Sequence, residues 1–219
     1  MNEVGAIGSG GQIIAMFPLG SVVYPGMPLS LQVFEPRYLR MLEHCLASGS
    51  GFGVVLIDRG SEVGGGDTRS GFGTLVTVED ARPTPDGVWK VLARGTSRIR
   101  VHEWLEDAPY PRAAVSIWSE EVPKADPSTI LEQCMESMTD FYARVTDRGR
   151  PIRLDFSVLS ADPVEAGWQL CAASPVGDAD RQKLLGTPDV VARLELLNAM
   201  VIEQAELLDS DGPSSGGPQ

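Results

Sequence analysis

An apolar stretch near the start of the chain is broken at short intervals by proline and glycine. It reads MFPLGSVVYPGMPLSLQVF from Met16 to Phe34 and contains no charged residue. A membrane-spanning helix needs about 20 consecutive apolar residues, and a stretch interrupted this often by proline and glycine cannot form a continuous helix of that length. Because proline lacks an N–H donor and glycine supplies unusual backbone angles, the pattern predicts short strands joined by tight turns at Leu19–Gly20 and Pro25–Gly26. The apolar side chains are therefore expected to face a protein core.

A helix and a run of strands are predicted to follow. Pro36 suits the first turn of a helix, and leucines then recur at helical spacing to Leu46. Five later segments have the composition of strands: FGVVLI from Phe52, FGTLVTV from Phe72, VWKVLA from Val88, SRIRVHEWL from Ser97 and AAVSIW from Ala113. Asp86–Gly87 is typical of the tight turn between antiparallel strands. Such a series predicts a small β-barrel or sandwich.

The composition changes after Trp118, where prolines mark a link to a helical region and predict a boundary near residue 122. Apolar residues at helical spacing predict two long helices, one around residues 131–145 and one around 191–208, with two shorter helices between them. Thr187 is expected to cap the last helix, with Pro188 at its first position. The predicted class is α+β, with a flexible segment 1–11, a β-barrel over 12–122, a helical bundle over 123–208 and a disordered tail over 209–219.

The charge balance argues against several classes of partner. The formal net charge is −12 and the isoelectric point is about 4.6, so the chain is expected to repel nucleic acids and anionic membranes. Three well-separated cysteines in apolar helical contexts predict buried free thiols and a reducing, cytoplasmic location. Two histidines are too few for an ordinary zinc site, and no Gly-Lys pair exists for a phosphate loop, so neither metal nor cofactor is predicted.

Two arginines form the one candidate anion contact. ARGTSRIRV places Arg98 and Arg100 on the same face of a predicted strand, with Ile99 and Val101 on the other. A small anion site is one interpretation. The alternative is a solvated strand face balanced by nearby acidic residues, which is favoured because nucleic-acid binders show a broader basic surface.

The opening stretch, MFPLGSVVYPGMPLSLQVFEPRYLRML, closely resembles the start of the Lon N-terminal, or Lon substrate-binding, domain family. The resemblance continues through FGVVLI, GFGTLVTVED, PDGVWKVLARGTSRIRV, YPRAAVSIW and DADRQKLLGTPDVVARLELLNAMVIEQ, and covers the chain from about Ile13 to Leu208. It implies a barrel of the PUA-like type (pseudouridine synthase and archaeosine transglycosylase) followed by a helical bundle. It also implies a region that engages substrate proteins, since other modules of full Lon proteases hydrolyse ATP and cleave peptide bonds.

One short string looks catalytic. DGPSSGG from Asp211 resembles the motif around the Lon catalytic serine and would nominate Ser214. That chemistry pairs the serine with a lysine later in the chain, whereas all three lysines precede Ser214. We interpret the string as a chance match and predict a stand-alone, non-enzymatic protein.

The leading functional hypothesis is a module that binds unfolded or extended polypeptide, as an adaptor or quality-control factor. Tyr24 and Met27 are the candidate contacts, because the Pro-Gly turn that holds them would present an exposed apolar surface. The alternative interpretation is that both side chains pack internally. The competing functions are an RNA-binding PUA-like protein and an enzyme with a small-molecule pocket.

Overall fold

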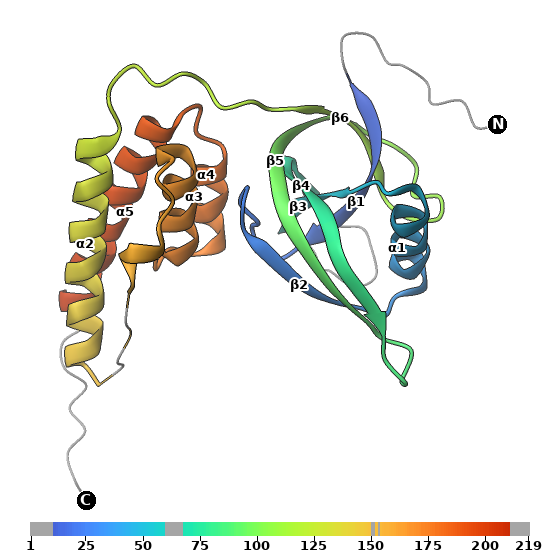
Figure 1. Cartoon of the computed structure of the whole chain (residues 1–219), viewed down its shortest axis with the longest axis horizontal. Coiled ribbons are helices and arrows are strands. Elements are labelled where there is room, and N and C mark those ends of the chain that lie inside the picture. Colours follow the sequence, from blue (N-terminus) through green and yellow to red (C-terminus); the bar gives the residue numbers. More distant parts are fainter. Residues whose placement is uncertain (1–10, 60–67, 150–151, 153, 211–219) are drawn as a thin grey trace, which may run out of the picture. The chain divides into compact units, whose positions relative to one another are not determined.

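The computed structural model describes residues 11–59, 68–149, 152 and 154–210, and it divides into two compact units (Figure 1). The first unit ends at Ser119 and the second begins at Glu120, whereas the sequence placed the boundary near residue 122. Residues 1–10 of the expected flexible segment 1–11, residues 211–219 of the expected tail 209–219, and with them Ser214, lie outside the described residues.

The first unit combines one helix with one mixed sheet, which confirms the α+β class. In the described ranges its helix is α1 (Pro36–Ser48), and its six strands are β1 (Gln12–Leu19), β2 (Pro28–Val33), β3 (Phe52–Arg59), β4 (Thr68–Pro83), β5 (Trp89–Trp104) and β6 (Arg112–Ile117). As the sequence predicts, α1 begins with proline in its first turn.

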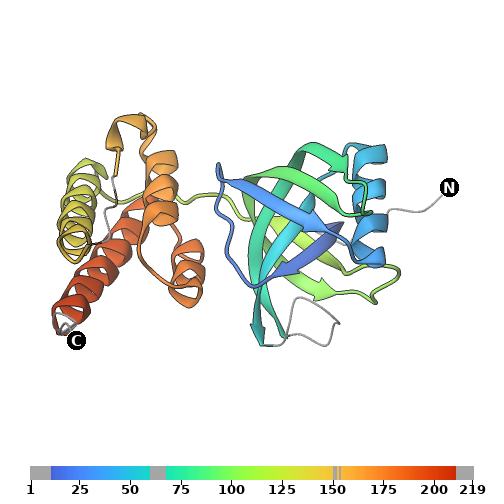
Figure 2. The same ribbon diagram turned by 90° about the horizontal axis from the view of Figure 1, so that it is seen from below.

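The strands follow the order β2-β5-β4-β3-β1-β6, and β5 also pairs with β6. The pairing therefore runs in a circuit through β5, β4, β3, β1 and β6, and β2 extends from β5 outside that circuit. Only β1 and β3 are parallel among the pairs formed by the described strands. Seen from below, these strands curve around one another, with α1 on one side of the sheet (Figure 2).

Strand β5 is longer than the sequence predicts. The segments VWKVLA and SRIRVHEWL, expected as two strands, form one strand of 16 residues. Gly95 lies between them because β5 passes very close to the turn before β2: a Cβ at this position would lie 2.3 Å from the carbonyl oxygen of Tyr24. The glycine marks a close approach between two backbones, and the strand continues through it.

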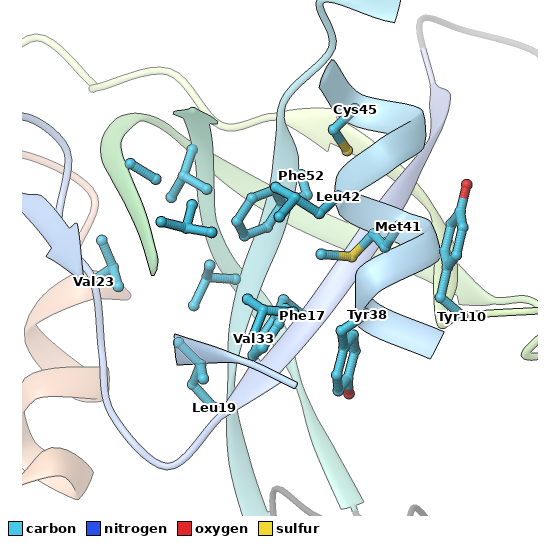
Figure 3. Packing of buried hydrophobic residues seen from close by; sticks show 14 residues of the cluster. Phe17, Leu19, Val23, Val33, Tyr38, Met41, Leu42, Cys45, Phe52 and Tyr110 are labelled. Atoms are coloured by element: carbon cyan, nitrogen blue, oxygen red, sulfur yellow. The ribbon is translucent and has the colours of Figure 1, made fainter. Parts of the chain in front are cut away.

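The main core of this unit lies between the sheet and α1. The helix contributes Tyr38, Met41, Leu42 and Cys45, and the sheet contributes Phe17 and Phe52 among others (Figure 3). The rings of Phe17 and Tyr38 stack with centroids 4.2 Å apart. The apolar stretch at the start of the chain therefore faces a core, as predicted.

The second unit is helical in its described part. Its elements are α2 (Ser128–Asp147), the 3₁₀ helix η1 (Phe156–Val158), α3 (Pro163–Ala173), α4 (Asp178–Leu185) and α5 (Val190–Ser210). Helices α2 and α5 are joined by a buried contact, in which the Cys134 thiol donates to the Leu194 carbonyl oxygen.

The start and end of α5 differ from the sequence prediction. Asp189 caps the helix, since its carboxylate accepts from the Ala192 N–H at 3.0 Å, while the Thr187 hydroxyl donates to the Leu184 carbonyl at the end of α4. The predicted Thr187 cap was wrong because the chain turns once more, through Pro188, before α5 begins. The helix then continues through Asp209, which forms ion pairs with Arg144 of α2 and with Arg148, the residue that follows α2.

Candidate functional site

The Pro25–Gly26 turn has the conformation that its sequence predicts. Gly26 has φ +80°, and the Met27 N–H donates to the Tyr24 carbonyl at 3.1 Å, which together define a type II turn. The Tyr24 side chain is 1% exposed and belongs to the buried residues, and Met27 is half-buried. The Tyr24 side chain therefore packs internally, as the alternative interpretation of the sequence has it.

The turn also aligns β2 against β5. The Gly26 N–H donates to the Gly95 carbonyl and the Gly95 N–H donates to the Met27 carbonyl, both at 2.9 Å. Two residues thus oppose one, with the first in a positive-φ conformation, which is the arrangement of a G1 bulge. The carbonyl of Met27 points at β5, and this fixes the direction of every backbone group that follows in β2.

Backbone groups of alternate β2 residues point away from the neighbouring strand β5. In an antiparallel pair, residues alternate between those that bond to the partner strand and those that face away from it. The β2–β5 register continues without a shift from Pro28 opposite Arg94 to Val33 opposite Trp89. Since Met27 bonds to β5, Leu29, Leu31 and Val33 do so too, and Pro28, Ser30 and Gln32 face outward. Proline at an outward position fits an edge strand, because no donor is lost from the ladder.

No described strand pairs with this outward edge of β2. Among the described strands β2 pairs with β5 alone, so the N–H and C=O groups of Ser30 and Gln32 are available to a further strand. Both side chains are exposed, while Val33 at the end of the strand is buried in the core. We call the backbone of Ser30 to Gln32 on the side that faces away from β5 the β2 edge.

Two hollows adjoin the β2 edge and share Ser30, Leu31 and Gln32; the first is mainly apolar, and the second mixes apolar residues with Asp80 and Lys90. The first, about 180 Å³, has walls from β1 and α1, where Phe17, Leu19 and Tyr38 lie near Val33 (Figure 3). Phe34 lies at this hollow with 57% of its surface exposed. The second, about 370 Å³, is lined by residues of β4 and β5, including Leu92, which is 39% exposed. Apolar side chains therefore flank the unpaired backbone.

The two candidate arginines are engaged with an aromatic ring. The guanidinium carbons of Arg98 and Arg100 lie 4.5 and 4.0 Å from the centroid of Trp118, whose ring also meets Phe72 edge-on. Contact of both arginines with the Trp118 ring agrees with the prediction that they share one face of the strand. Arg98, however, is only 3% exposed, so the interpretation as a wholly solvated strand face was wrong for this residue, because stacking on Trp118 covers it.

The cysteines are unsuited to nucleophilic chemistry in the described part of the chain. Burial raises the pKa of Cys134 and of Cys171 to about 12, and it also raises the pKa of Cys45. A thiol that keeps its proton is a poor nucleophile and a poor metal ligand. Within the described ranges no group of three or more His, Cys, Asp or Glu side chains could hold a metal ion, and no helix is both long and apolar enough to cross a membrane.

The β2 edge was not predicted from the sequence. The predicted contacts, Tyr24 and Met27, precede the strand, and neither lines the two hollows. The usable signals were Pro28 at the start of a strand, which is typical of an edge, and the alternation of Ser30 and Gln32 with apolar residues before Phe34. These signals do not say which strand lies beside β2, and the direction of its backbone groups depends on that neighbour.

The family model for the ATP-dependent protease La (LON) substrate-binding domain matches residues 13–203. Among curated proteins, a Lon protease of Brevibacillus choshinensis is 24% identical over 92% of this chain, and a Lon protease 2 of Thermus thermophilus is 25% identical over 86%. The matched part is 26% of the first protease and 23% of the second. The chain thus spans about a quarter of the length of the curated relatives that it matches.

Two solved structures resemble this one. A Lon N-terminal domain protein from Xanthomonas campestris has a TM-score of 0.63 and 28% identity, covering 86% of this chain and 98% of that one. The N-terminal domain of a Mycobacterium avium complex Lon protease has a TM-score of 0.57 and 18% identity, with 89% and 98% covered. The second likeness concerns the fold alone.

Proposed function

Because the chain belongs to the family of ATP-dependent protease La (LON) substrate-binding domains, we propose that it binds extended segments of other polypeptides and does not cleave them. The observation that carries this proposal is the β2 edge. Its outward N–H and C=O groups match the backbone of an extended chain, which would add to the sheet as a further strand.

The flanking hollows supply the side-chain part of the recognition. Successive side chains of an added strand point to opposite faces of the sheet, and a hollow adjoins the β2 edge on the β1 side and another on the β4–β5 side. Exposed Phe34 and Leu92 favour apolar residues in the bound segment. An unfolded protein exposes such segments, whereas a folded protein buries them.

In this proposal the residues singled out in the sequence act indirectly. Tyr24 and Met27 hold the turn and bulge that direct Ser30 and Gln32 outward, and Arg98 and Arg100 hold Trp118 in place. The first unit corresponds to the PUA-like small barrel of residues 12–122 and the second to the helical bundle of residues 123–208. We place the protein in the cytoplasm, as an adaptor or quality-control factor that works without a cofactor.

A matched pair of variants tests the role of the β2 edge. Gln32→Pro removes an outward N–H and adds a ring on that side, while its inward neighbours keep their bonds to β5. Gln32→Thr keeps the N–H and favours the strand. Binding of a labelled, permanently unfolded protein, such as reduced and carboxymethylated lactalbumin, is measured by fluorescence anisotropy.

We expect Gln32→Pro to weaken binding by about tenfold or more, since one lost hydrogen bond is worth ~0.5–1.5 kcal/mol and the ring adds a clash. Gln32→Thr should bind as the wild type does. Equal affinities of the two variants, with the fold intact by circular dichroism, would contradict strand addition at β2. Phe34→Ser provides a second test, because it removes an exposed apolar contact and leaves the backbone unchanged.

A further inference from the structure

The first unit contains a second hollow region that shares no lining residue with the β2 edge. Its volume is about 440 Å³, within the range of small-molecule sites. Three segments distant in sequence meet there: the start of β1 at Ile13, the end of α1 at His44 and the loop that leads into β6 at Pro109. We call it the Arg112 cavity, after the charged residue in its wall.

Arg112 is a half-buried cation for which the described residues supply no ion-pair partner. Its Nε atom is buried and has no hydrogen-bond partner, and its guanidinium makes no ion pair within the described part of the chain. An unsatisfied buried donor costs folding free energy, and a charged donor costs more than a neutral one. The chain carries a net charge of −12, yet the described residues that line this cavity include no Asp or Glu. The local charge is therefore positive in a strongly acidic protein.

Other polar groups stand beside the cation. The Tyr110 hydroxyl and the His44 Nδ1 atom are hydrogen-bonded at 2.7 Å, and their rings meet edge-on. Burial raises the pKa of Tyr110, so the hydroxyl keeps its proton at neutral pH. Ser50 adds a second hydroxyl to the wall, while Ile13 and Pro109 supply apolar surface. The wall can thus bind one negative group and also enclose an apolar body.

From this arrangement we propose that the Arg112 cavity binds the carboxylate of an organic acid with a short apolar body, with the Arg112 guanidinium as its ion-pair partner. A guanidinium presents two parallel N–H donors that match the two oxygens of a carboxylate. One cation balances one negative charge. The C-terminal end of α1 also lies at the cavity and has a partial negative charge, which opposes a phosphate dianion more strongly than a single carboxylate.

The carboxylate can come from two sources: a free organic acid, or the C-terminal residue of a polypeptide. The site does not depend on strand addition at β2, so the two proposals can fail separately. The ligands for the test are N-acetyl-leucine and its amide, a short peptide ending in leucine as free acid and as C-terminal amide, and inorganic phosphate. Their binding is followed by shifts of the backbone amide signals of Gly51 and Tyr110 in NMR titrations.

Three variants complete the experiment. Arg112→Gln removes the cation, and Arg82→Gln, on an exposed arginine of β4, is the matched control. Ile13→Glu places a carboxylate at the mouth of the cavity without disturbing the core, since Ile13 is 36% exposed. Arg112→Gln should retain the wild-type melting temperature, because the guanidinium has no protein partner to lose.

We expect N-acetyl-leucine to bind, and its amide to bind about tenfold more weakly or not at all. Arg112→Gln and Ile13→Glu should each weaken binding of the acid by about tenfold or more, with Arg82→Gln unchanged. If the free-acid peptide binds as well as N-acetyl-leucine, the source of the carboxylate is a polypeptide C-terminus. If N-acetyl-leucine binds and the peptide does not, the source is a free organic acid. The proposal is overturned if N-acetyl-leucine and its amide bind alike, or if Arg112→Gln binds the acid as the wild type does. It is also overturned if phosphate binds better than the acid, or if no acid at about 10 mM shifts the amide signals of Gly51 and Tyr110.

Discussion

Replacing Glu120 with alanine should destabilise the second unit more than replacing its buried partner Arg193 with methionine. Arg193 lies in α5 with 0% of its surface exposed, and its Nη2 atom donates to the Glu120 carboxylate at 2.5 Å. The guanidinium carbon lies 3.3 Å from the centroid of Trp168, while Nε and Nη1 have no hydrogen-bond partner among the described residues. Burial lowers the pKa of Arg193, because the charged form is less stable away from water.

The magnitudes follow from that geometry. Breaking a buried ion pair by removing one partner costs ~3–5 kcal/mol, because the remaining charge has no counter-ion. The Glu120 side chain is 21% exposed, so we expect about 3 kcal/mol for Glu120→Ala. Arg193→Met loses the contact with Trp168, worth ~1–2 kcal/mol, but it also removes two unsatisfied donor nitrogens, each costing ~1–3 kcal/mol. Its net effect should lie within about 1 kcal/mol of zero.

Urea unfolding followed by circular dichroism measures the difference, provided that the slope of free energy against urea is the same for all variants. The double variant completes a thermodynamic cycle, and it should be more stable than Glu120→Ala alone, because no buried charge remains. If Arg193→Met costs as much as Glu120→Ala, or if the double variant loses the sum of both, the account of an uncompensated buried charge is refuted.

Three further predictions concern the first unit. Tyr24→Ala should lower the free energy of unfolding by ~3 kcal/mol or more, as for other buried aromatic residues, and a loss below about 1 kcal/mol in thermal unfolding would show that Tyr24 is not part of the core. Gly26→Val should cost ~1–3 kcal/mol through backbone strain alone, since φ is +80° and nothing lies within 4 Å of an added Cβ; an unchanged melting temperature would argue against the turn. RNA should bind more weakly than ~10⁻⁶ M at physiological salt, and a tighter, specific site lost in Arg98→Glu or Arg100→Glu would instead favour the RNA-binding function.

Features governed by neighbouring residues could be predicted from the sequence. Pro25–Gly26 specifies a type II turn because proline fixes one φ and glycine permits the next, and the same local logic gives Gly87 its φ of +83° in the turn between β4 and β5. Proline at the start of α1 is a local signal as well. In each case the chemistry of two or three adjacent residues determines the backbone.

Features that depend on partners far along the chain could not be predicted in this way. The outward direction of Ser30 and Gln32 follows from pairing with β5, some 60 residues later, and from the bulge opposite Gly95. The Arg112 cavity likewise forms only when β1, α1 and β6 meet. Burial of Arg98 depends on Trp118, which returns to the same face after another strand. Alternation along one strand says which side chains share a face, but it does not say what covers that face.

Hydrogen exchange of the β2 amides, resolved by NMR with and without an unfolded polypeptide, tests the central proposal most directly. The amides of Leu29 and Leu31 bond to β5 and should exchange slowly in both conditions, which makes them an internal control. The amides of Ser30 and Gln32 face outward and should exchange fast in the free protein and slowly once the polypeptide saturates it. If the polypeptide binds while Ser30 and Gln32 continue to exchange at their free rates, strand addition at the β2 edge is contradicted.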